Sequence, residues 1–308
     1  MDYGLSLDAS FFKGHGHGND YLVFEEGEDW PVTSNSVQIV CQRTRGVGGD
    51  GIVALLSADF GKTSSSGGEE EPLPEVFRLR MFNPDGSEFE RSGNGLRVLG
   101  AHLFLTGRVG LGQTFEVEVG GDRLKMEILS VDPGAGLHVA VEMGRANFGI
   151  GTEEWDRETL TLDSGWEGRA PGPIQVHPVS VGNPHCVVFR PELREEEFLG
   201  LGPWLTSHPV FPEGTNVQLA RVREEGRVEI LIWERGVGRT ESSGSSACAV
   251  AAACVRRGLL QPGRIRVQME GGEFSVSVSP EIQVRLEGPV QPLARGKLMP
   301  ELVGGLTR

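Results

Sequence analysis

The chain has 308 residues, 38% of them hydrophobic, with a formal net charge of -14 at pH 7 and a sequence pI near 5.0. At about 150 residues per domain, this length predicts two domains with separate cores. The acidic balance argues against nucleic acid as a partner, because nucleic-acid-binding proteins gather Lys and Arg on one face. No charged segment followed by a long apolar run opens the chain, and no run of about 18 apolar residues occurs. We therefore expect no signal peptide and no membrane span, and a cytoplasmic location.

The cysteines and histidines give no metal-binding pattern. The four cysteines are Cys41, Cys186, Cys248 and Cys254. None of them forms the C-x-x-C spacing of zinc or redox sites, so we interpret them as free thiols. The histidines near the polar motifs lack a third ligand at a defined spacing. We expect no metal site.

The N-terminal half predicts short strands followed by one apolar helix. The predicted strands are 12–13, 21–24, 51–56, 77–82, 114–119 and 123–129. Residues 57–74, rich in Ser, Gly and Glu, predict a solvated loop between two of them. After Ser92 the pattern becomes helical, and we expect the helix to be buried. Its apolar stripe consists of Leu96, Leu99, Leu103 and Phe104.

The C-terminal half repeats this order. Residues 132–136, rich in Gly and Pro, predict the junction between the two domains. The strands predicted after it are 138–143, 174–181, 186–189 and 228–233. A Gly-rich turn then precedes Ser243 and an Ala-rich helix at 247–257. Each half is therefore predicted as strands, a Gly/Ser turn and one apolar helix.

Two similar segments, half a chain length apart, begin at Ser92 and Ser243 and read SGNGLRVLGA and SGSSACAVAA. A small residue followed by Gly at a helix start leaves backbone N–H groups unpaired, and the helix dipole attracts anions there. Two such starts can bind one carboxylate. The alternative is that both serines are ordinary N-caps, a position that serine prefers. We favour a binding site because the turn, the serine and the polar residues recur together in both copies.

Asparagines gather in further polar turns. The segments are 15–20, with sequence HGHGND, Asn83 in an Asn-Pro-Asp-Gly turn, 182–185 and 214–216. The first lacks the G-x-G-x-x-G spacing of a dinucleotide site. Neutral amides suit a ligand that carries both ammonium and carboxylate groups. Local capping of the backbone by turn asparagines is the alternative at each position.

Glu234 and Arg235 end a predicted strand just before the second Gly-rich turn. Arg can bind a carboxylate through two hydrogen bonds while Glu binds an ammonium, which is the pair that an amino-acid ligand needs. The alternative is a surface ion pair. We favour ligand binding because both residues adjoin the turn that leads to Ser243.

Motifs for the common cofactors are absent from the sequence. We find no P-loop, H-E-x-x-H or G-x-S-x-G element. A pyridoxal enzyme needs a Schiff-base lysine, and of the four lysines only Lys13 lies near a motif. We expect no cofactor.

Over nearly its full length, the chain resembles the diaminopimelate epimerase family. The similar segments are 12–20, 45–51, 83–97, 182–185, 214–216, 234–249, 270–272 and 287–289, in the family's order. The resemblance implies an α+β fold of two pseudo-symmetric domains, each a β-rich barrel-like layer around a central helix, with the active site between them. The implied domains are 1–133 with a C-terminal strand at about 291–308, and 134–290.

The same resemblance implies an epimerase that interconverts LL- and meso-diaminopimelate, a precursor of lysine and peptidoglycan, without pyridoxal phosphate. One group removes the α-proton and a second returns a proton to the opposite face. The implied catalytic residues are Ser92, Ser243, His185 and Glu234. The implied substrate-binding residues are Asn19, Asn83, Gly93, Asn94, Asn183, Asn216, Glu234, Arg235, Gly244 and Ser245.

The chain departs from the family at the two acid/base positions, because serines stand where the family has cysteines. A thiol has a pKa near 8.5, which a helix N-terminus lowers further, whereas an alcohol is far less acidic. A serine base needs a partner to take its proton. Candidate partners are His15, His185 and Glu234. The neighbouring residues Val98, Arg239 and Ser246 also differ from the family pattern, which favours a natural serine-bearing branch over an engineered pair of substitutions.

Two other hypotheses remain open from the sequence. One is a related isomerase or lyase that acts on another small amino or hydroxy acid. The other is a catalytically silent homologue that binds diaminopimelate. The resemblance also implies a homodimer, since closed two-fold dimers are common among soluble proteins.

Overall fold

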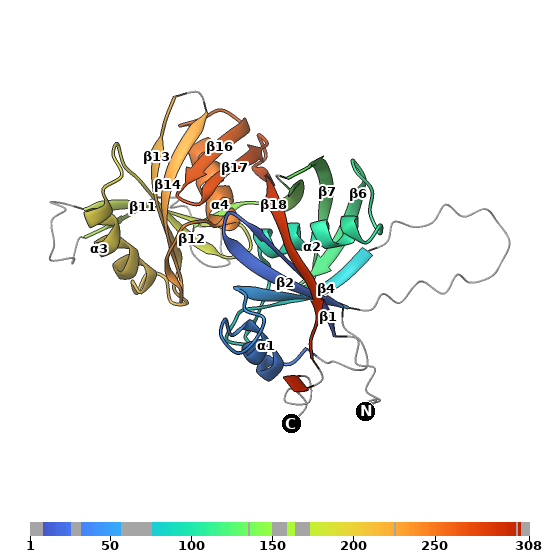
Figure 1. Ribbon diagram of the computed structural model, residues 1–308. Coiled ribbons are helices and arrows are strands. Elements are labelled where there is room, and N and C mark those ends of the chain that lie inside the picture. The colour runs from blue at the N-terminus through green and yellow to red at the C-terminus, as the bar shows by residue number, and fades with distance from the viewer. Residues whose placement is uncertain are drawn as a thin grey trace, which may run out of the picture. The chain divides into compact units, whose positions relative to one another are not determined.

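The computed structural model describes residues 9–25, 32–56, 76–134, 136–149, 159–163, 173–224, 226–299 and 301–302 (Figure 1). The loop predicted at 57–74 lies outside these ranges. The chain divides into two compact units, Met1–Val141 with Pro289–Arg308, and Glu142–Gly288. The domain boundaries given above stay a prediction. The ends of the predicted junction, Asp132 and Gly136, pair where the strand β7 (Asp122–Asp132) turns into β8 (Gly136–Arg145).

The first unit is a sheet wrapped around the helix α2 (Gly93–Leu105). Its other elements are β1 (Ser10–Gly16), β2 (Asn19–Glu25), α1 (Ser34–Cys41), β3 (Gly51–Leu55), β4 (Val76–Phe82), β5 (Glu88–Phe89), β6 (Thr114–Val119), β7 (Asp122–Asp132), the start of β8 (Gly136–Arg145) and the end of β18 (Gln283–Lys297). The strands pair in the order β18, β1, β2, β3, β4, β6, β7 and β8, and β8 pairs with β18 in turn. The sheet therefore closes on itself.

The second unit repeats this pairing around the helix α4 (Gly244–Arg256). Its other elements are β9 (Asn147–Phe148), β10 (Leu160–Leu162), β11 (Ile174–Ser180), β12 (Pro184–Phe189), α3 (Glu195–Thr206), β13 (Asn216–Val222), β14 (Arg227–Glu234), β15 (Gly238–Thr240), β16 (Gly263–Met269) and β17 (Gly272–Val278). The pairs β11–β12, β13–β14, β16–β17 and β17–β18 are antiparallel, and β12–β13 and β14–β16 are parallel. This matches the order of parallel and antiparallel pairs in the first unit. The α+β fold predicted from the resemblance is confirmed.

The central helices are buried by different means. In α2 the predicted apolar stripe is confirmed at Leu96, Leu99 and Leu103, which are all 0% exposed. In α4 half of the buried residues are alanines, whose small side chains let strands approach the helix closely. α4 begins at Gly244, three residues before the predicted start.

Two further helices were not predicted. α1 follows β2, and α3 occupies the matching place after β12. Each outer helix covers a sheet face opposite to the central helix, so β3 between α1 and α2 is buried at every position. In α3 the side chains of Phe198, Leu201 and Leu205 pack on β12 and β13 in this way. The prediction of a polar turn at 214–216 was wrong for Asn216, which opens β13.

No helix in the ranges given above is long and apolar enough to cross a membrane.

Candidate functional site

The helix α2 begins at Ser92, whose backbone is extended and whose Oγ accepts a hydrogen bond from the N–H of Gly95 at 3.2 Å. The N–H of Ser92 donates to the sulfur of Met81 at 3.2 Å. Ser92 is therefore a helix N-cap. Within the described part of this unit, the N–H groups of Gly93 and Asn94 donate no hydrogen bond, so this helix start offers two donors in a positive field.

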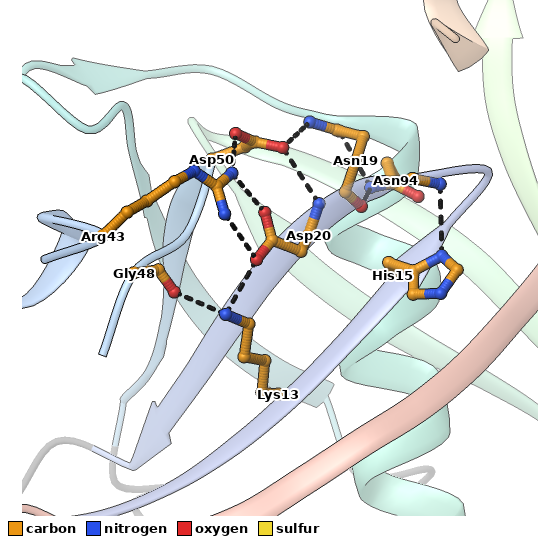
Figure 2. A network of polar contacts seen from close by, with 9 residues as sticks. Lys13, His15, Asn19, Asp20, Arg43, Gly48, Asp50 and Asn94 are labelled. Carbon is orange, nitrogen blue, oxygen red and sulfur yellow. Dashed lines mark hydrogen bonds and ion pairs between the residues drawn. The ribbon is translucent and has the colours of Figure 1, made fainter. Parts of the chain in front are cut away.

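The hairpin of β1 and β2 lies against this helix start. His17 and Gly18 form its two-residue loop with positive φ at both positions, 54° and 88°. The loop places Asn19 where its backbone oxygen and its Oδ1 accept hydrogen bonds from the side-chain amide of Asn94 (Figure 2). The Asn94 Oδ1 accepts in turn from Arg97, which is fully buried. Two predicted ligand-binding asparagines are thus brought together.

Charged side chains extend from this pair of asparagines (Figure 2). Asn19 Nδ2 donates to Asp50 Oδ2 at 3.0 Å, and Arg43 bridges Asp50 and Asp20 at 2.6 and 2.8 Å. Lys13 completes the cluster with an ion pair to Asp20 at 2.8 Å and a hydrogen bond to Gly48 O. We call Lys13, Asp20, Arg43 and Asp50, with Asn19 and Asn94, the charged network. Burial opposes ionisation of Asp20, but hydrogen bonds from Arg43 and Lys13 overcome it and lower its pKa to about 2.

The helix α4 begins in the same way. Ser243 is its N-cap, and the Ser243 Oγ accepts a hydrogen bond from the N–H of Ser246 at 3.4 Å and lies 3.4 Å from the Ser245 Oγ. In the described part of this unit, the N–H groups of Gly244 and Ser245 donate no hydrogen bond. The Ser243 side chain therefore has the same local role as that of Ser92.

A chain of buried polar groups without charge runs beneath this helix start. Gln218 Nε2 donates to the Ser246 Oγ at 2.9 Å and lies 3.0 Å from His185 Nδ1. The other ring nitrogen of His185, Nε2, lies 3.0 Å from Asn183 Oδ1. We call Asn183, His185, Gln218 and Ser246 the neutral network. Burial lowers the pKa of His185 to about 3, although the hydrogen bond with Gln218 opposes this, so the imidazole is neutral at physiological pH.

Asn216 joins three strand ends in the second unit. Its Nδ2 donates to the backbone oxygen of Pro184 at 3.1 Å, and its Oδ1 accepts from the backbone N–H of Arg235 at 2.9 Å. The Arg235 guanidinium donates to Glu213 O at 2.8 Å. Asn216 therefore links the start of β12, at Pro184, to Arg235, which directly follows the end of β14.

The comparisons with known proteins show the family of this chain. The family model described as diaminopimelate epimerase matches residues 11–149 and 178–291. The chain belongs to the diaminopimelate epimerase family. A relative named diaminopimelate epimerase 2 from Nostoc sp. is 35% identical over 300 residues, covering 95% of this chain and 96% of that protein. The diaminopimelate epimerase of Desulforudis audaxviator is 35% identical over 298 residues, covering 93% of this chain and 98% of that protein.

Solved structures share the fold. The structure of a predicted epimerase from Pseudomonas aeruginosa has a TM-score of 0.66 at 21% identity and covers 94% of this chain and 99% of that chain. A hydroxyproline epimerase of Agrobacterium vitis has a TM-score of 0.67 at 14% identity and covers 99% of this chain and 96% of that chain. At these identities the likeness shows the fold alone. The family is one of epimerases, which are isomerases.

Not every residue that the diaminopimelate epimerase family implies joins a network. Asn83 hydrogen-bonds to Ser87 within the turn that links β4 to β5. His15 accepts a hydrogen bond from the N–H of Gly18 in its own hairpin. The hydrogen bonds recorded for His185 run to Asn183 and Gln218, and none of them to Ser243.

Six network members were not predicted as site residues from the sequence: Lys13, Asp20, Arg43, Asp50, Gln218 and Ser246. Asp50 lies in the Gly-Gly-Asp-Gly segment before β3, and Gln218 is a polar residue inside the apolar strand β13. A glutamine within an otherwise apolar strand is the signal that could have identified Gln218. Its side chain lies on the face of β13 that packs against α4.

The cysteines of this epimerase-family chain are shielded from solvent. All four are free and buried. Burial raises the pKa of Cys41 and of Cys254 to about 12 and also raises that of Cys186. Thiolates at these positions are thus disfavoured near neutrality. Among the residues that the structure describes, no group of three or more His, Cys, Asp and Glu side chains can hold a metal ion.

Proposed function

We propose that this protein interconverts LL- and meso-diaminopimelate by proton transfer at the α-carbon, without a cofactor, in the cytoplasmic synthesis of lysine and peptidoglycan precursors. Family membership and the names of the full-length relatives support the substrate. The observation that carries the proposal is the repeated helix start. Ser92 and Ser243 cap equivalent helices in two units of the same topology, as the two acid/base groups of an inversion require.

The groups around each serine suit an amino-acid ligand. The N–H groups of Gly93 and Asn94, and of Gly244 and Ser245, are donors for carboxylates at helix N-termini. In the proposal Asn19, Asn83, Asn183 and Asn216 bind or orient the polar ends of the substrate. Glu234 binds an ammonium group, and Arg235 a carboxylate.

The serines limit the rate of the proposed reaction. A helix N-terminus stabilises a negative charge by about 1 kcal/mol, which lowers a pKa by roughly one unit. This shift leaves an alcohol far above neutrality, whereas a thiol at the same position ionises readily. We therefore expect slow α-proton exchange with Ser92 and Ser243, and faster exchange when both are cysteine.

Deuterium incorporation tests the function. The protein is incubated with LL- or meso-diaminopimelate in deuterated water, and α-deuterium is measured by mass spectrometry beside a Ser92→Cys, Ser243→Cys double variant, a Ser92→Ala, Ser243→Ala double variant and a blank without enzyme. Label above the blank in the wild type, lost in the alanine variant, supports the proposal. Label only in the cysteine variant assigns the wild type to a silent binding protein.

Calorimetry separates the remaining outcome. If neither the wild type nor the cysteine variant binds or labels diaminopimelate, the proposed substrate is wrong, and a panel of other amino and hydroxy acids becomes the next test. We further propose a homodimer, to be checked by light scattering of the purified protein.

A further inference from the structure

Gln218 lies at the centre of the neutral network. Its side chain is 0% exposed, and its Nε2 is within hydrogen-bond distance of two acceptors, His185 Nδ1 at 3.0 Å and Ser246 Oγ at 2.9 Å. In the described part of the chain its Oε1 has no partner. A buried amide in an apolar strand is costly, and an unpartnered oxygen adds to that cost. Such a residue needs a reason beyond packing.

The first consequence concerns the proton on His185. Because Gln218 donates to Nδ1, this nitrogen carries the lone pair, and the hydrogen of the neutral ring resides on Nε2. That hydrogen points to Asn183 Oδ1 at 3.0 Å. The orientation of the Gln218 amide therefore fixes the His185 tautomer, and the tautomer fixes the orientation of the Asn183 amide.

The second consequence concerns Asn183, which lies before β12 and is partly exposed. With its Oδ1 held by His185, the carboxamide of Asn183 presents its NH2 group on the other side. This group donates no hydrogen bond within the described residues. The NH2 group of Asn183 is therefore available to donate a hydrogen bond to an anionic group of a ligand.

The third consequence concerns α4. Ser246 accepts from Gln218 through its Oγ, and donates through its N–H to the Ser243 Oγ. A glycine at position 246 would leave one Gln218 hydrogen without an acceptor. Gln218 and Ser246 thus form a matched pair that links the first turn of α4 to His185.

We propose that Gln218 is a positioning residue: by donating to His185 and Ser246 it holds His185 as the Nε2–H tautomer, so that Asn183 offers its NH2 group to a substrate carboxylate. The substrate in this statement rests on the proposed function. The tautomer of His185 does not depend on the proposed function, and it can be measured without substrate.

The test is long-range 1H–15N NMR of protein labelled with 15N-histidine, in which the two ring nitrogens of each neutral tautomer are distinguished. The signals of His185 are assigned by their absence in His185→Gln. The expected wild-type result at pH 7 is a neutral ring with hydrogen on Nε2. Hydrogen on Nδ1, or a protonated ring, overturns the proposal.

Variants then separate positioning from folding. In Gln218→Glu the carboxylate accepts from Nδ1, and we expect the His185 hydrogen to move to that nitrogen or the ring to become protonated. Gln218→Met removes both donors at similar volume, and the Nε2–H preference should be lost. The matched control is Gln268→Met, because within the described residues the Gln268 side chain donates only to Met269 O and Gly272 O of its own hairpin, so this variant should leave the His185 signals unchanged. An unchanged tautomer in both Gln218 variants overturns the proposal.

Calorimetry with LL-diaminopimelate supplies the second readout. Gln218→Met should weaken binding about tenfold, the loss expected for a misplaced hydrogen bond to a charged group, and Gln268→Met should not. If the wild type binds no diaminopimelate, the proposed function fails while the NMR result still decides the role of Gln218. If the wild type binds and Gln218→Met binds equally well, the positioning role fails alone.

Discussion

The two units build the same helix start on opposite electrostatic principles. In the first unit Asn19, beside the start of α2, is hydrogen-bonded to Asp50, which belongs to a cluster of two cations and two carboxylates. In the second unit the corresponding groups near the start of α4 are His185, Gln218 and Ser246, none of which carries a charge. The two networks differ in burial: the Arg43 side chain at the edge of the charged network is 59% exposed and Asp20 at its centre 10% exposed, whereas Gln218 and Ser246 are 0% exposed. In the charged network the buried carboxylate of Asp20 is balanced by two cations, and in the neutral network the buried polar groups are joined by hydrogen bonds without charge.

Removing the central carboxylate of the charged network should give the largest effect. Asp20→Asn leaves the mostly buried Lys13 and the Arg43 guanidinium without their shared partner, and we expect a loss of about 3 kcal/mol in the free energy of unfolding. Denaturant titration measures it. The matched control is Asp122→Asn, whose partner Arg91 is 3.5 Å away and whose own side chain is 62% exposed. Equal losses in the two variants would show that burial does not set the strength of the charged network.

Mild acid should affect the second unit first. Burial holds the pKa of His185 at about 3, against 6.5 for an unperturbed histidine, so between these values only the unfolded chain binds the proton. Stability therefore falls as the pH drops from 6.5 toward 3, by about 1.4 kcal/mol per pH unit. For Asp20 the pKa is lowered from 3.8 to about 2, so its contribution is complete above 3.8 and is lost as the pH falls through 2.

Hydrogen exchange of separate segments checks this order. Between pH 6.5 and 5, β12 and β13 should lose protection before β2 and β3 do, after correction for the intrinsic pH dependence of exchange. His185→Gln should flatten the decline of stability over this range, and the exposed His138→Gln should not. Simultaneous loss of protection in both units would contradict the assignment to His185.

Crowding the charged network should give a smaller effect. A Cβ at Gly16 would collide with Asn94 Oδ1 and would lie 2.7 Å from an Arg97 nitrogen and 2.9 Å from Pro289 O. We expect Gly16→Ala to cost about 2 kcal/mol, within the range for overpacking, and to weaken diaminopimelate binding by displacing Asn94. The control is Gly110→Ala, where the nearest atom is 3.4 Å away. Thermal unfolding and calorimetry measure both effects, and a neutral Gly16→Ala would show that Asn94 has room to move.

The exposed edge of the charged network should matter least. Arg43→Gln removes its ion pairs with Asp20 and Asp50, but because the side chain is mostly solvated we expect a loss of no more than about 1 kcal/mol. Added salt should shrink the difference from wild type, since ions screen solvated charges. Denaturant titration at low and high salt measures it. A salt-independent loss would mean that Arg43 acts through packing.

The sequence predicts the repeated architecture well where local patterns suffice. Leu96, Leu99 and Leu103 mark α2, and the serine before each central helix marks its start. The outer helix α1 escaped prediction because it has only 8 residues, and α3 because Gly200, Gly202 and Pro203 interrupt its helical pattern. The strand β13 was not predicted at all, and its start at Asn216 was hidden by the turn residues before it.

The networks themselves depend on contacts between distant segments. Asn19, Asn94 and Asn183 were predicted as site residues from the resemblance and from their turns. The links from Asp50 to Asn19 and from Gln218 to His185 join residues that lie 31 and 33 positions apart. Strand register decides such contacts, and no local pattern reports it.

The burial of all four cysteines has a consequence for chemical durability. Peroxides and electrophiles attack thiolates, and the pKa of Cys41 and of Cys254 is raised to about 12, so those two thiols stay protonated inside the protein. Hydroxyl groups at positions 92 and 243 do not oxidise under the same conditions. In the proposed reaction, a serine pair at the helix starts is therefore slower than a cysteine pair but is not inactivated by oxidative stress.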